Sequence, residues 1–391
     1  MKIKKIKPLD SKSLEEIGLA WHEDPDTTPY IADEMVVVSQ EEAEAFYNAG
    51  NTLYDMYIEA AECVIKEERF FELDIPNSMI PLIKQSFEED IHWHLYGRFD
   101  LSGGLDGKPI KLLEFNADTP TMLFETAVVQ WALLKFNGYD EASQFNDVFE
   151  ALTQNFKRII TLGEDIAKFD ALYEGWKILF SSIKGNLEEE RTTRFLQEIA
   201  QSAGFNTHYA PFDEVEFSGE RGCYFEGINY EFLFKLIPWE SIAIDEPELA
   251  LLCGEMMQNK NTIFLNPAYT LLFQSKRMLK VLWDLYPNHP LLLETSYDLL
   301  RNKKQVEKVS FGREGANIRV LDPQGSVISE NNGIYGNQKR IFQEFCELNE
   351  ANGFYYQPNV FFAYESCALG FRKGGIILDN YSKFVSHLLE D

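Results

Sequence analysis

The spacing of hydrophobic and polar positions changes along this chain, and the changes predict a mixed α/β protein. Residues 11–70 are predicted to be mainly helical. The clearest helix runs from Glu41 to Lys66, where apolar side chains recur at helical spacing between acidic ones. Ser39 has the side chain of a helix N-cap. Two prolines, Pro76 and Pro81, are expected to break the helical pattern.

Residues 176–210 are typical of a β-α-β unit. A short apolar strand precedes a helix from Glu188 to Ala203, Gly204 ends the helix, and a second strand follows. Ligands of α/β sheets bind at the carboxyl ends of such strands. The other patterns predict strands within 223–239, 306–320, 341–346, 360–362 and 368–372, helices at 124–134 and within 263–286, and a loop followed by a short helix at 378–387.

Residues 98–121, RFDLSGGLDGKPIKLLEFNADTPT, predict a β-hairpin with charged side chains on one face. Alternate residues of a strand share a face, so Arg98 and Asp100 point to one side of the first strand. Glu114 and Asn116 share a side of the second strand. The apolar residues between them are expected to point the opposite way, and these are Phe99, Leu113 and Phe115.

The loop of this hairpin decides whether the two polar faces coincide. A two-residue turn at Asp106-Gly107 would set Asp100 opposite Leu113. A three-residue loop, or a bulge near the paired glycines, would set Asp100 opposite Glu114. Arg98 would then face Asn116. We therefore predict an odd-length loop or a bulge.

Oxygen atoms of carboxylates and amides are the ligands that Mg²⁺ prefers, and Mg²⁺ commonly binds together with a phosphate. The hairpin is therefore a candidate metal site. The alternative is an edge hairpin whose polar face is simply solvated.

A glycine-rich turn, FGREGAN at 311–317, lies between two predicted strands. Gly312 and Gly315 would let backbone N–H groups approach an anion closely. The turn joins strand to strand, so it is neither a Walker A loop nor a dinucleotide fingerprint. A flap over nucleotide phosphates fits better, and a hairpin turn without a ligand is the alternative.

Isolated polar residues add candidates with less support. Lys308, five residues before Arg313, and Lys276 could each reach a phosphate, although isolated lysines are usually surface residues. His92 and His94 alternate like strand residues. No third histidine lies in that region, so we assign both a packing or polar-face role.

Composition narrows the classes of function. The chain has 391 residues, of which 45% are hydrophobic and 25% charged, and its formal net charge is −27. Such a charge argues against nucleic acid, whose phosphates would be repelled, and permits a cationic partner such as a polyamine. Five cysteines without C-x-x-C spacing indicate reduced thiols and a cytoplasmic protein. Neither a secretory signal nor an apolar run near ~18 residues is present, so no membrane partner is expected.

Together these features form the set that an ATP-dependent ligase requires. Mg²⁺ and cationic side chains neutralise the phosphate charge that shifts as a phosphoryl group moves to a carboxylate. An acidic pocket nearby would hold an incoming amine.

The motifs RFD, LLEFNADTPT, GREGANI and GFR resemble the synthetase domain of glutathionylspermidine synthase. They are more similar still to shorter bacterial homologues, named only as acid–amine ligases, that lack the amidase domain. The resemblance covers residues 20–390 and implies an α/β ATP-grasp fold with a preceding α/β (pre-ATP-grasp) lobe and a helical N-terminal region. It implies a single catalytic unit with approximate sub-lobes at 1–90 (mainly helical), 91–170 (metal hairpin and core), 171–260 (pre-ATP-grasp-like) and 261–391 (lid and core).

The resemblance also implies the cofactors, ATP and Mg²⁺. By this likeness the metal ligands are Asp100, Glu114 and Asn116. The nucleotide would be gripped by Lys276 and Lys308 beneath the flap glycines Gly312 and Gly315. The strand Ile341–Phe345, with Gln343 and Glu344, would offer its backbone to adenine.

Three arginines and two pairs of polar residues are implied at the reacting end. Arg98 would lie beside the phosphates, Arg313 would contact phosphate or the acid, and Arg372 would stabilise the transferring phosphoryl group. The acid would lie near Thr119 and Thr121, and the amine near Glu188 and Glu189. Asp118 is predicted to hold the turn rather than the metal.

The implied activity is an acid–amine ligase that forms an amide through an acyl phosphate. The acid is expected to be a small molecule such as glutathione or a peptide, and the amine a polyamine. A peptide ligase with an amino-acid acceptor and a catalytically silent nucleotide- or polyamine-binding protein are the alternatives. Two departures from the family pattern are Val309 in place of proline and GFRKGG in place of an acidic continuation after Arg372. The second lies beside a proposed catalytic residue and bears on the identity of the substrate.

Overall fold

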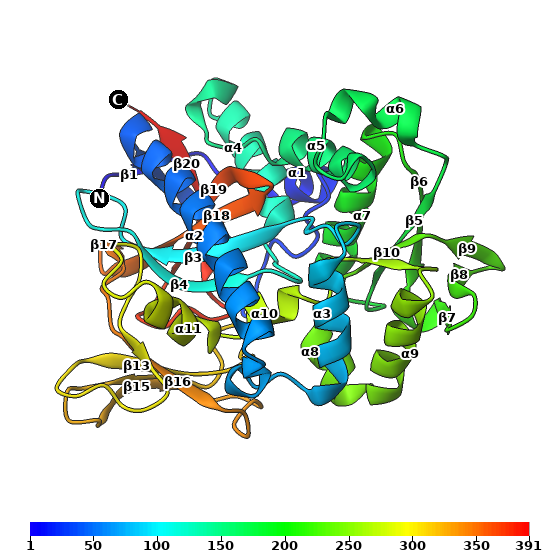
Figure 1. Ribbon diagram of the computed structural model, residues 1–391. Helices are drawn as coiled ribbons and strands as arrows, with labels where there is room; N and C mark the ends of the chain where they lie inside the picture. Colours follow the sequence, from blue (N-terminus) through cyan, green and yellow to red (C-terminus); the bar gives the residue numbers. More distant parts are fainter. Residues whose placement is uncertain (391) are drawn as a thin grey trace.

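The computed structural model describes residues 1–390, and its largest element is an eight-stranded sheet, here called the core sheet (Figure 1). Its neighbouring strands are antiparallel except for one parallel pair, β2 with β20. In spatial order the strands are β1 (Ile3–Lys5), β2 (Ile31–Val38), β20 (Lys383–Leu389), β19 (Glu365–Gly374), β18 (Phe354–Ala363), β3 (Gly97–Ser102) and β4 (Lys111–Asn116), with β17 (Asn349–Ala351) beside β18.

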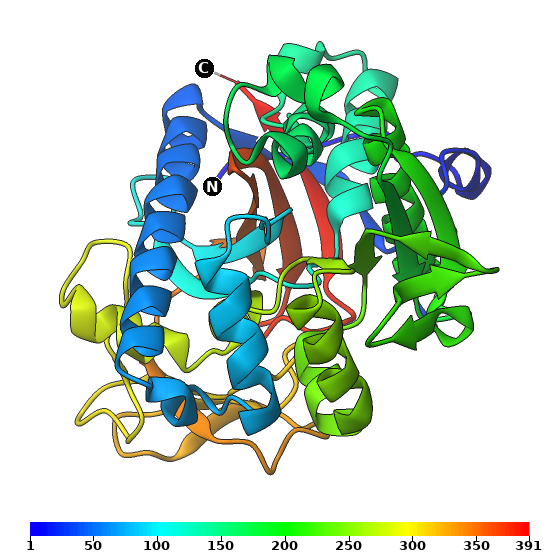
Figure 2. The same ribbon diagram turned by 45° about the vertical axis from the view of Figure 1, so that its right-hand side comes forward.

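Helix α2 (Gln40–Lys66) crosses one face of the core sheet, as Figures 1 and 2 show. Ser39 caps this helix through a reciprocal pair of hydrogen bonds with Glu42, so the predicted cap is confirmed. Alternate residues of β18 divide between two hydrophobic clusters: Val360 packs on the α2 side, and Phe361 packs on the side of α4 and α5. The core sheet is therefore covered on both faces.

A second sheet of four parallel strands forms a separate layer, seen at the right of Figure 1. Its strands are β11 (Ile263–Leu265), β10 (Phe232–Lys235), β5 (Lys177–Ser182) and β6 (Asn206–Pro211). The predicted β-α-β unit is confirmed, since α7 (Leu187–Ser202) joins the parallel neighbours β5 and β6. A small antiparallel sheet of β7 (Glu216–Ser218), β8 (Gly222–Phe225) and β9 (Ile228–Tyr230) follows β6 in the chain.

A third antiparallel sheet, here called the lid sheet, lies at the lower left of Figure 1. It contains β12 (Thr295–Ser296), β16 (Arg340–Glu344), β13 (Gln305–Val309), β14 (Ile318–Leu321) and β15 (Val327–Asn331). The predicted strand pair around the glycine-rich turn is therefore present as β13 and β14.

The remaining segments of regular structure are short. The helices are α1 (Ser11–Glu16), α3 (Ile80–Glu88), α4 (Gln130–Phe136), α5 (Val148–Thr161), α6 (Phe169–Leu172), α8 (Trp239–Asp245), α9 (Pro247–Gln258), α10 (Thr270–Gln274) and α11 (Met278–Leu285). The single-turn elements are η1 (Arg69–Leu73), η2 (Asn77–Met79), η3 (Glu125–Val129), η4 (Glu141–Ser143), η5 (Ile166–Lys168) and η6 (Phe212–Glu214). Pro81 starts α3 rather than breaking a helix, because the first helical turn tolerates proline.

Four strands of the core sheet were not predicted as strands: β1, β2, β17 and β20. The prediction that residues 11–70 are mainly helical was wrong at 31–38, which form β2. Residues 383–389 form β20 instead of a short helix, and two of its polar residues, Ser386 and His387, are fully buried. His387 accepts the backbone N–H of Phe145 at 2.9 Å, so its polarity is satisfied inside the protein. In β2 the buried Glu34 accepts hydrogen bonds from Tyr356 and Lys373, both at 2.6 Å. Buried polar residues of this kind interrupt the apolar pattern, so the pattern does not indicate a buried strand.

The core sheet draws strands from three separated parts of the chain, residues 3–38, 97–116 and 349–389. Because one sheet combines these three parts, the strand order does not test the four predicted sub-lobe boundaries, which stay a prediction.

Candidate active site

The hairpin of β3 and β4 has the predicted register. Arg98 pairs with Asn116, and Asp100 pairs with Glu114. A bulge follows in β4, which agrees with the prediction of an odd-length loop or a bulge. The bulge lies at Leu113 rather than at the paired glycines, because Leu101 pairs with Leu112. The prediction that Leu113 points away from the polar face was therefore wrong: Leu113 lines the pocket, and Leu112 takes its place in the core.

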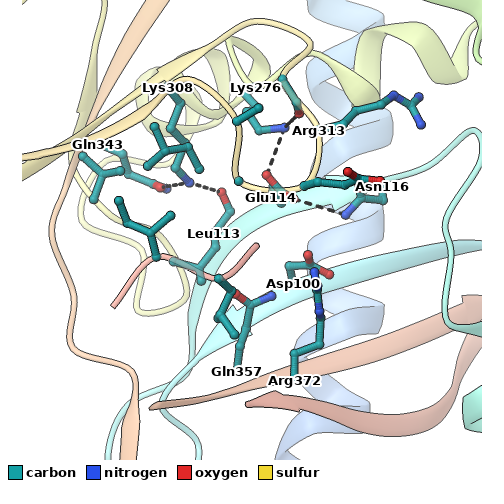
Figure 3. Close-up of a pocket in the computed structure, with 18 of the residues that line it drawn as sticks. Asp100, Leu113, Glu114, Asn116, Lys276, Lys308, Arg313, Gln343, Gln357 and Arg372 are labelled. Atoms are coloured by element: carbon teal, nitrogen blue, oxygen red, sulfur yellow. Dashed lines mark hydrogen bonds and ion pairs between the residues drawn. The ribbon is translucent and has the colours of Figure 1, made fainter. Parts of the chain in front are cut away.

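The opposite face of the hairpin is apolar. The rings of Phe99 and Phe115 stack 3.9 Å apart and pack beside Tyr57 of α2. This packing fixes the direction of the polar face, which points away from α2 into a pocket between the core sheet and the lid sheet (Figure 3).

Neighbouring strands extend the polar face. Asn359 of β18 pairs with Asp100 of β3, and Gln357, two residues earlier on β18, pairs with Arg372 of β19. Asn359 and Gln357 share one face because they are two residues apart. Gly370 stands opposite Asn359, and a Cβ there would lie 3.1 Å from the hydroxyl of Thr126.

An ion pair inside the sheet holds Asp100. Arg98 donates from Nε to Oδ1 at 2.7 Å and from Nη2 to Oδ2 at 3.0 Å. Asn359 donates to the same Oδ1 at 2.8 Å. Arg98 also donates to the carbonyl of Thr121 at 2.8 Å, so one buried guanidinium joins the metal candidate to the turn after the hairpin.

Glu114 lies at the centre of the pocket, as Figure 3 shows. Its Oε2 lies 3.0 Å from Nζ of Lys276, and its Oε1 accepts from the amide of Asn116 at 3.3 Å. Burial opposes ionisation of this carboxyl, but Lys276 and Lys308 outweigh the burial and lower its pKa to about 2. Glu114 is therefore charged at neutral pH.

The sequence pattern placed Lys276 within the helix expected at 263–286, and this was wrong. Lys276 lies in the link between α10 and α11. The helix is interrupted there because the backbone N–H of Lys276 donates to the carbonyl of Ser310 at 2.9 Å. Its ammonium reaches the carbonyl of Gly312 at 2.7 Å, so Lys276 ties the flap to Glu114.

Lys308 of β13 points into the same pocket (Figure 3). Its ammonium donates to the carbonyl of Leu113 and to Oε1 of Gln343, both at 2.8 Å. Burial lowers the pKa of Lys308 to about 8, although Glu114 acts in the opposite direction. Gln343 also donates to the carbonyl of Leu112 at 3.0 Å, which fixes the amide that holds this lysine.

The flap needs its two glycines for space. Gly315 has φ +70°, and a Cβ there would lie 2.2 Å from the carbonyl oxygen of Leu378. A Cβ on Gly312 would lie 2.8 Å from the side chain of Val309. The flap is thus packed closely against the segment that follows β19, where Arg372 donates to the carbonyl of Asp379.

The far end of the pocket is apolar. Its walls combine side chains of the lid sheet with the chain after β16 and the loop after β19, namely Val306, Ile318, Val320, Phe345, Leu348, Ile376 and Ile377. Gln343 and Glu344 line it as well. However, β16 is paired on both sides, and the N–H groups of Glu344 and Phe345 donate to backbone carbonyls elsewhere. The N–H groups of Glu344 and Phe345 therefore already have partners, and the backbone contact of Ile341–Phe345 with adenine stays a prediction.

Fourteen of the predicted site residues line this one pocket. They are Arg98, Asp100, Glu114, Asn116, Thr119, Thr121, Lys276, Lys308, Gly312, Arg313, Gly315, Gln343, Glu344 and Arg372. Glu188 and Glu189 are not among the lining residues and lie in the first turn of α7. Their roles and those of the fourteen stay proposals.

Glu188 and Glu189 lie where burial and neighbouring acids disfavour their ionised forms. Burial raises the pKa of Glu188 to about 8, and the nearby Glu125 and Glu314 act in the same direction against Arg372. Burial also raises the pKa of Glu189 and of Glu125. Glu125 is fully buried, and its Oε1 accepts from Trp21 and Tyr30, both at 3.0 Å.

No group of three or more His, Cys, Asp or Glu side chains within residues 1–390 is arranged to hold a metal ion. Mg²⁺ is commonly bound through one or two carboxylates together with substrate phosphates rather than by a complete protein cage. Asp100, Glu114 and Asn116 supply two carboxylates and an amide oxygen from facing positions of one hairpin. This donor set fits Mg²⁺ that binds with a nucleotide.

Sequence reasoning missed four polar residues that belong to this site. Gln357 and Asn359 interrupt the apolar strand FYYQPNVFFA at alternate positions, and that alternation was a usable signal. Glu314 lies on the flap and lines the pocket, and Glu240 holds Arg313 from α8. The sequence carried no signal for Glu240, because only the fold brings it to the flap.

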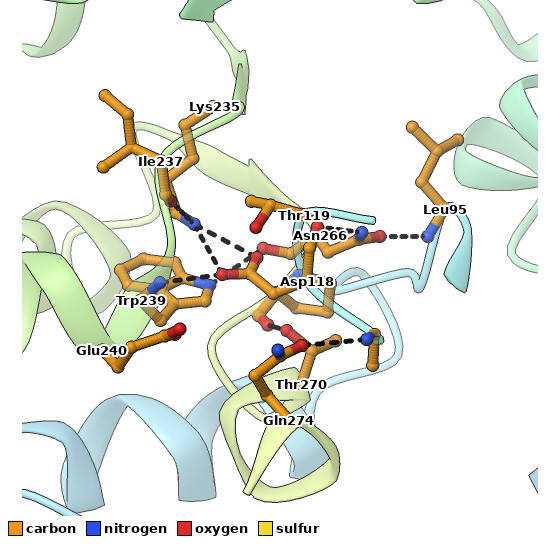
Figure 4. A network of polar contacts seen from close by, with 12 residues as sticks. Leu95, Asp118, Thr119, Lys235, Ile237, Trp239, Glu240, Asn266, Thr270 and Gln274 are labelled. Carbon is orange, nitrogen blue, oxygen red and sulfur yellow. Dashed lines mark hydrogen bonds and ion pairs between the residues drawn. The ribbon is translucent and has the colours of Figure 1, made fainter. Parts of the chain in front are cut away.

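Asp118 does not line the pocket, and its contacts agree with the predicted role of holding the turn. It accepts from Lys235 at 3.2 Å and from the backbone N–H of Trp239 at 2.7 Å, and it is fully buried (Figure 4). Burial raises its pKa to about 6. His94 is buried as well and hydrogen-bonds the carbonyl of Ala117 at 2.9 Å, which agrees with a packing role. His92 is buried without a hydrogen-bond partner in the described residues.

The chain was compared with known proteins. Residues 1–390 match the family model described as glutathionylspermidine synthase preATP-grasp. A Haemophilus influenzae protein provisionally named an acid–amine ligase is 30% identical over 361 residues, which is 88% of this chain and 87% of that protein. The bifunctional glutathionylspermidine synthetase/amidase of Escherichia coli is 22% identical over 90% of this chain and 57% of its own length. The chain thus spans little more than half of that longer relative.

A solved structure shows the same fold. The glutathione synthetase-like effector of Globodera pallida superposes with a TM-score of 0.58 at 12% identity and covers 98% of both chains. The predicted ATP-grasp-type α/β fold is confirmed. Among the helices of residues 1–390, none has the length and apolar character needed to cross a membrane.

Proposed function

The chain belongs to the glutathionylspermidine synthase preATP-grasp family, and on that premise we propose that it is an ATP- and Mg²⁺-dependent ligase that joins a carboxylic acid to an amine. The family and the named ligases among its relatives support the coarser statement, an acid–amine ligase. The dependence on ATP and the acyl-phosphate route are the finer part of the proposal.

One observation carries the proposal. Lys276 and Lys308 converge on Glu114 in a pocket between two antiparallel sheets, one side of which is apolar. An apolar slot suits a purine base, and cations beside carboxylates suit a metal-bound phosphate chain. No simpler ligand requires both halves in one pocket.

The reaction has two steps. An oxygen of the acid's carboxylate attacks the γ-phosphorus of ATP, and ADP leaves as the acyl phosphate forms. The amine nitrogen then attacks the acyl carbon, the phosphate leaves, and the nitrogen loses its proton as the amide forms. Arg98 and Arg372 would neutralise the charge on the transferring phosphoryl group, and Lys276 and Lys308 would hold the remaining phosphates.

A bound Mg²⁺ would supply positive charge that offsets the negative charge of the phosphates. Asp100, Glu114 and Asn116 would hold it from the hairpin. The acid would lie beside Thr119 and Thr121, where Arg313 also donates to the hydroxyl of Thr119 at 3.2 Å.

The amine would lie toward Glu188 and Glu189. A polyamine supplies the positive charge that these buried acids lack, and the net charge of −27 favours the approach of a cation. The names of the relatives contain glutathionylspermidine and trypanothione, so glutathione or a peptide is the first acid to try and spermidine the first amine.

Two linked measurements test this function. The melting temperature with ATP, in the presence and absence of Mg²⁺, is expected to rise most with both, because a ligand that binds only the folded state stabilises it. A screen of acids and amines is then expected to release ADP only when both substrates are present.

The outcomes separate the alternatives. Release of ADP with an amino acid as the acceptor would identify a peptide ligase instead. A thermal shift with no turnover on any pair would indicate a catalytically silent nucleotide-binding protein, and no shift at all would contradict a nucleotide site.

A further inference from the structure

The arginine of the flap is held by an acid from a different layer of the protein. Arg313 donates to Oε1 of Glu240 from Nε at 3.1 Å and from Nη2 at 2.6 Å. Its third nitrogen, Nη1, donates to the hydroxyl of Thr119 at 3.2 Å. Every nitrogen of this guanidinium therefore has a protein partner, and the ion pair determines where the charge lies.

The position of Glu240 is itself fixed. It is the second residue of α8, and the first, Trp239, donates its backbone N–H to Oδ2 of Asp118 at 2.7 Å. Lys235, just before α8, donates to Asp118 and to the carbonyl of Ile237 at 2.8 Å (Figure 4). The start of α8 is thus anchored to the turn that also carries Thr119.

These contacts close a ring of three segments. Asp118 holds α8, α8 presents Glu240, Glu240 holds Arg313, and Arg313 returns to Thr119, the neighbour of Asp118. A ring of this kind fixes each member more firmly than any single contact could.

Glu240 depends on the flap for its counter-charge. The residue is only 5% exposed, and its second oxygen, Oε2, is buried without a hydrogen-bond partner in the described residues. A buried carboxylate that loses its cation is strongly unfavourable. The flap therefore closes with Arg313 in one place, beside the acid-binding turn.

We propose that Glu240 is a positioning residue: it docks the flap on α8 so that the Arg313 guanidinium stands beside Thr119, where the carboxylate of the acid substrate binds. This inference rests on the proposed ligase function for its kinetic consequences. Its structural consequence, a docked flap, does not depend on any activity.

The flap has a second anchor, and the two differ in what they touch. Lys276 holds the carbonyl of Gly312 and pairs with Glu114, so a change there would disturb the nucleotide end as well. Glu240 does not line the pocket. Loss of its charge is expected to affect the acid substrate and to leave ATP binding unchanged.

Limited trypsin digestion provides the first test, because Arg313-Glu314 is itself a tryptic bond. Glu240→Gln is expected to speed cleavage after Arg313 on the order of tenfold to a hundredfold, the scale of a hydrogen bond to a charged group. Cleavage after the exposed Arg221 serves as an internal control for general unfolding. Glu248→Gln, an exposed residue of α9, is the matched control and should behave as the wild type.

Steady-state kinetics provide the second test. For Glu240→Gln, KM for the acid is expected to rise at least about tenfold while KM for ATP changes less than about twofold. In Arg313→Gln the further change Glu240→Gln should cost nothing more in kcat/KM, since Glu240 would act only through Arg313.

Three results would overturn the inference: unchanged cleavage after Arg313, equal increases in both KM values, or additive losses in the double variant. If the wild-type protein releases no ADP with any pair of substrates, the ligase proposal fails, and the digestion still decides the role of Glu240.

Discussion

The pocket and the first turn of α7, which does not line it, treat charge in opposite ways. At the proposed nucleotide end of the pocket each metal-ligand candidate with a carboxylate already has a cation: Asp100 is paired with Arg98, and Glu114 with Lys276. The pKa of Glu114 is accordingly lowered to about 2. Toward α7 the acids lack cations of their own, and burial raises the pKa of Glu188 to about 8.

This difference indicates which kind of ligand each of the two regions would bind. The nucleotide end has a balanced set of charges in place before any ligand arrives, and such preorganisation lowers the cost of binding a polyanion. Near Glu188, burial raises the pKa of the carboxyl, so a nearby cation would favour its ionised form. Within this account the amine substrate brings that cation.

The largest expected effect comes from unbalancing the nucleotide end. Glu114→Ala would remove a proposed metal ligand and leave Lys276 and Lys308 without their shared acid. We expect ADP release to fall by roughly a thousandfold or more, the scale of losing a group that acts in the transition state. Glu330→Ala on the exposed face of the lid sheet is the control and should keep wild-type turnover. Unchanged turnover in Glu114→Ala would remove this residue from the mechanism.

A change of pH is expected to weaken the nucleotide end by a smaller amount. Burial lowers the pKa of Lys308 to about 8, so the free protein loses this positive charge as the pH rises above 8. If ATP binds only the charged form, its affinity should fall by roughly 25-fold between pH 7.5 and 9.5. Calorimetric titration at constant ionic strength measures this directly.

Lys308→Arg supplies the control for that titration, because arginine stays protonated over the whole range. Its affinity for ATP should be nearly constant between the two pH values. A wild-type protein with equally constant affinity would show that Lys308 does not titrate there.

The smallest expected effect concerns the acidic end. Glu188 has a pKa near 4.5 when unfolded and about 8 when folded. From pH 4.5 to 8 the unfolded state therefore loses a proton that the folded state keeps, and the wild type is progressively destabilised as the pH rises. The melting temperature of Glu188→Gln should therefore rise relative to that of the wild type between pH 5 and 8. At about pH 8 the variant should melt a few degrees higher than the wild type.

Glu190, which is half-buried but pairs with Arg194 one turn later, is the matched control for that series. Glu190→Gln should change stability by less than about 1 kcal/mol, with no trend above pH 5. A flat difference for Glu188→Gln as well would contradict a buried, unpaired acid at this position. Spermidine should reduce the difference if it supplies the missing cation.

The sequence predicted the parts of the site that are local in the chain. The register of β3 and β4 followed from alternation and loop length, and the capped helix α2 from its periodicity. Lys276 was assigned to the site but placed inside a helix, because its backbone N–H donates to the carbonyl of the distant Ser310, a contact that the sequence does not show.

The rest depends on contacts between distant segments. Glu240 meets Arg313 across 73 positions of the chain, and Asn359 meets Asp100 across 259. No spacing rule connects such residues. The strand β20 was missed for a related reason, since its buried Ser386 and His387 look like surface residues until their neighbours are known.

The proposed ligase transfers a phosphoryl group to the acid before the amine attacks. The most direct measurement uses an acid whose carboxylate oxygens are labelled with ¹⁸O, together with ATP, Mg²⁺ and the amine found by the screen. An acyl phosphate predicts that one labelled oxygen appears in the inorganic phosphate for every amide formed, with ADP as the other product. Label in AMP, or none in the phosphate, would contradict the claim.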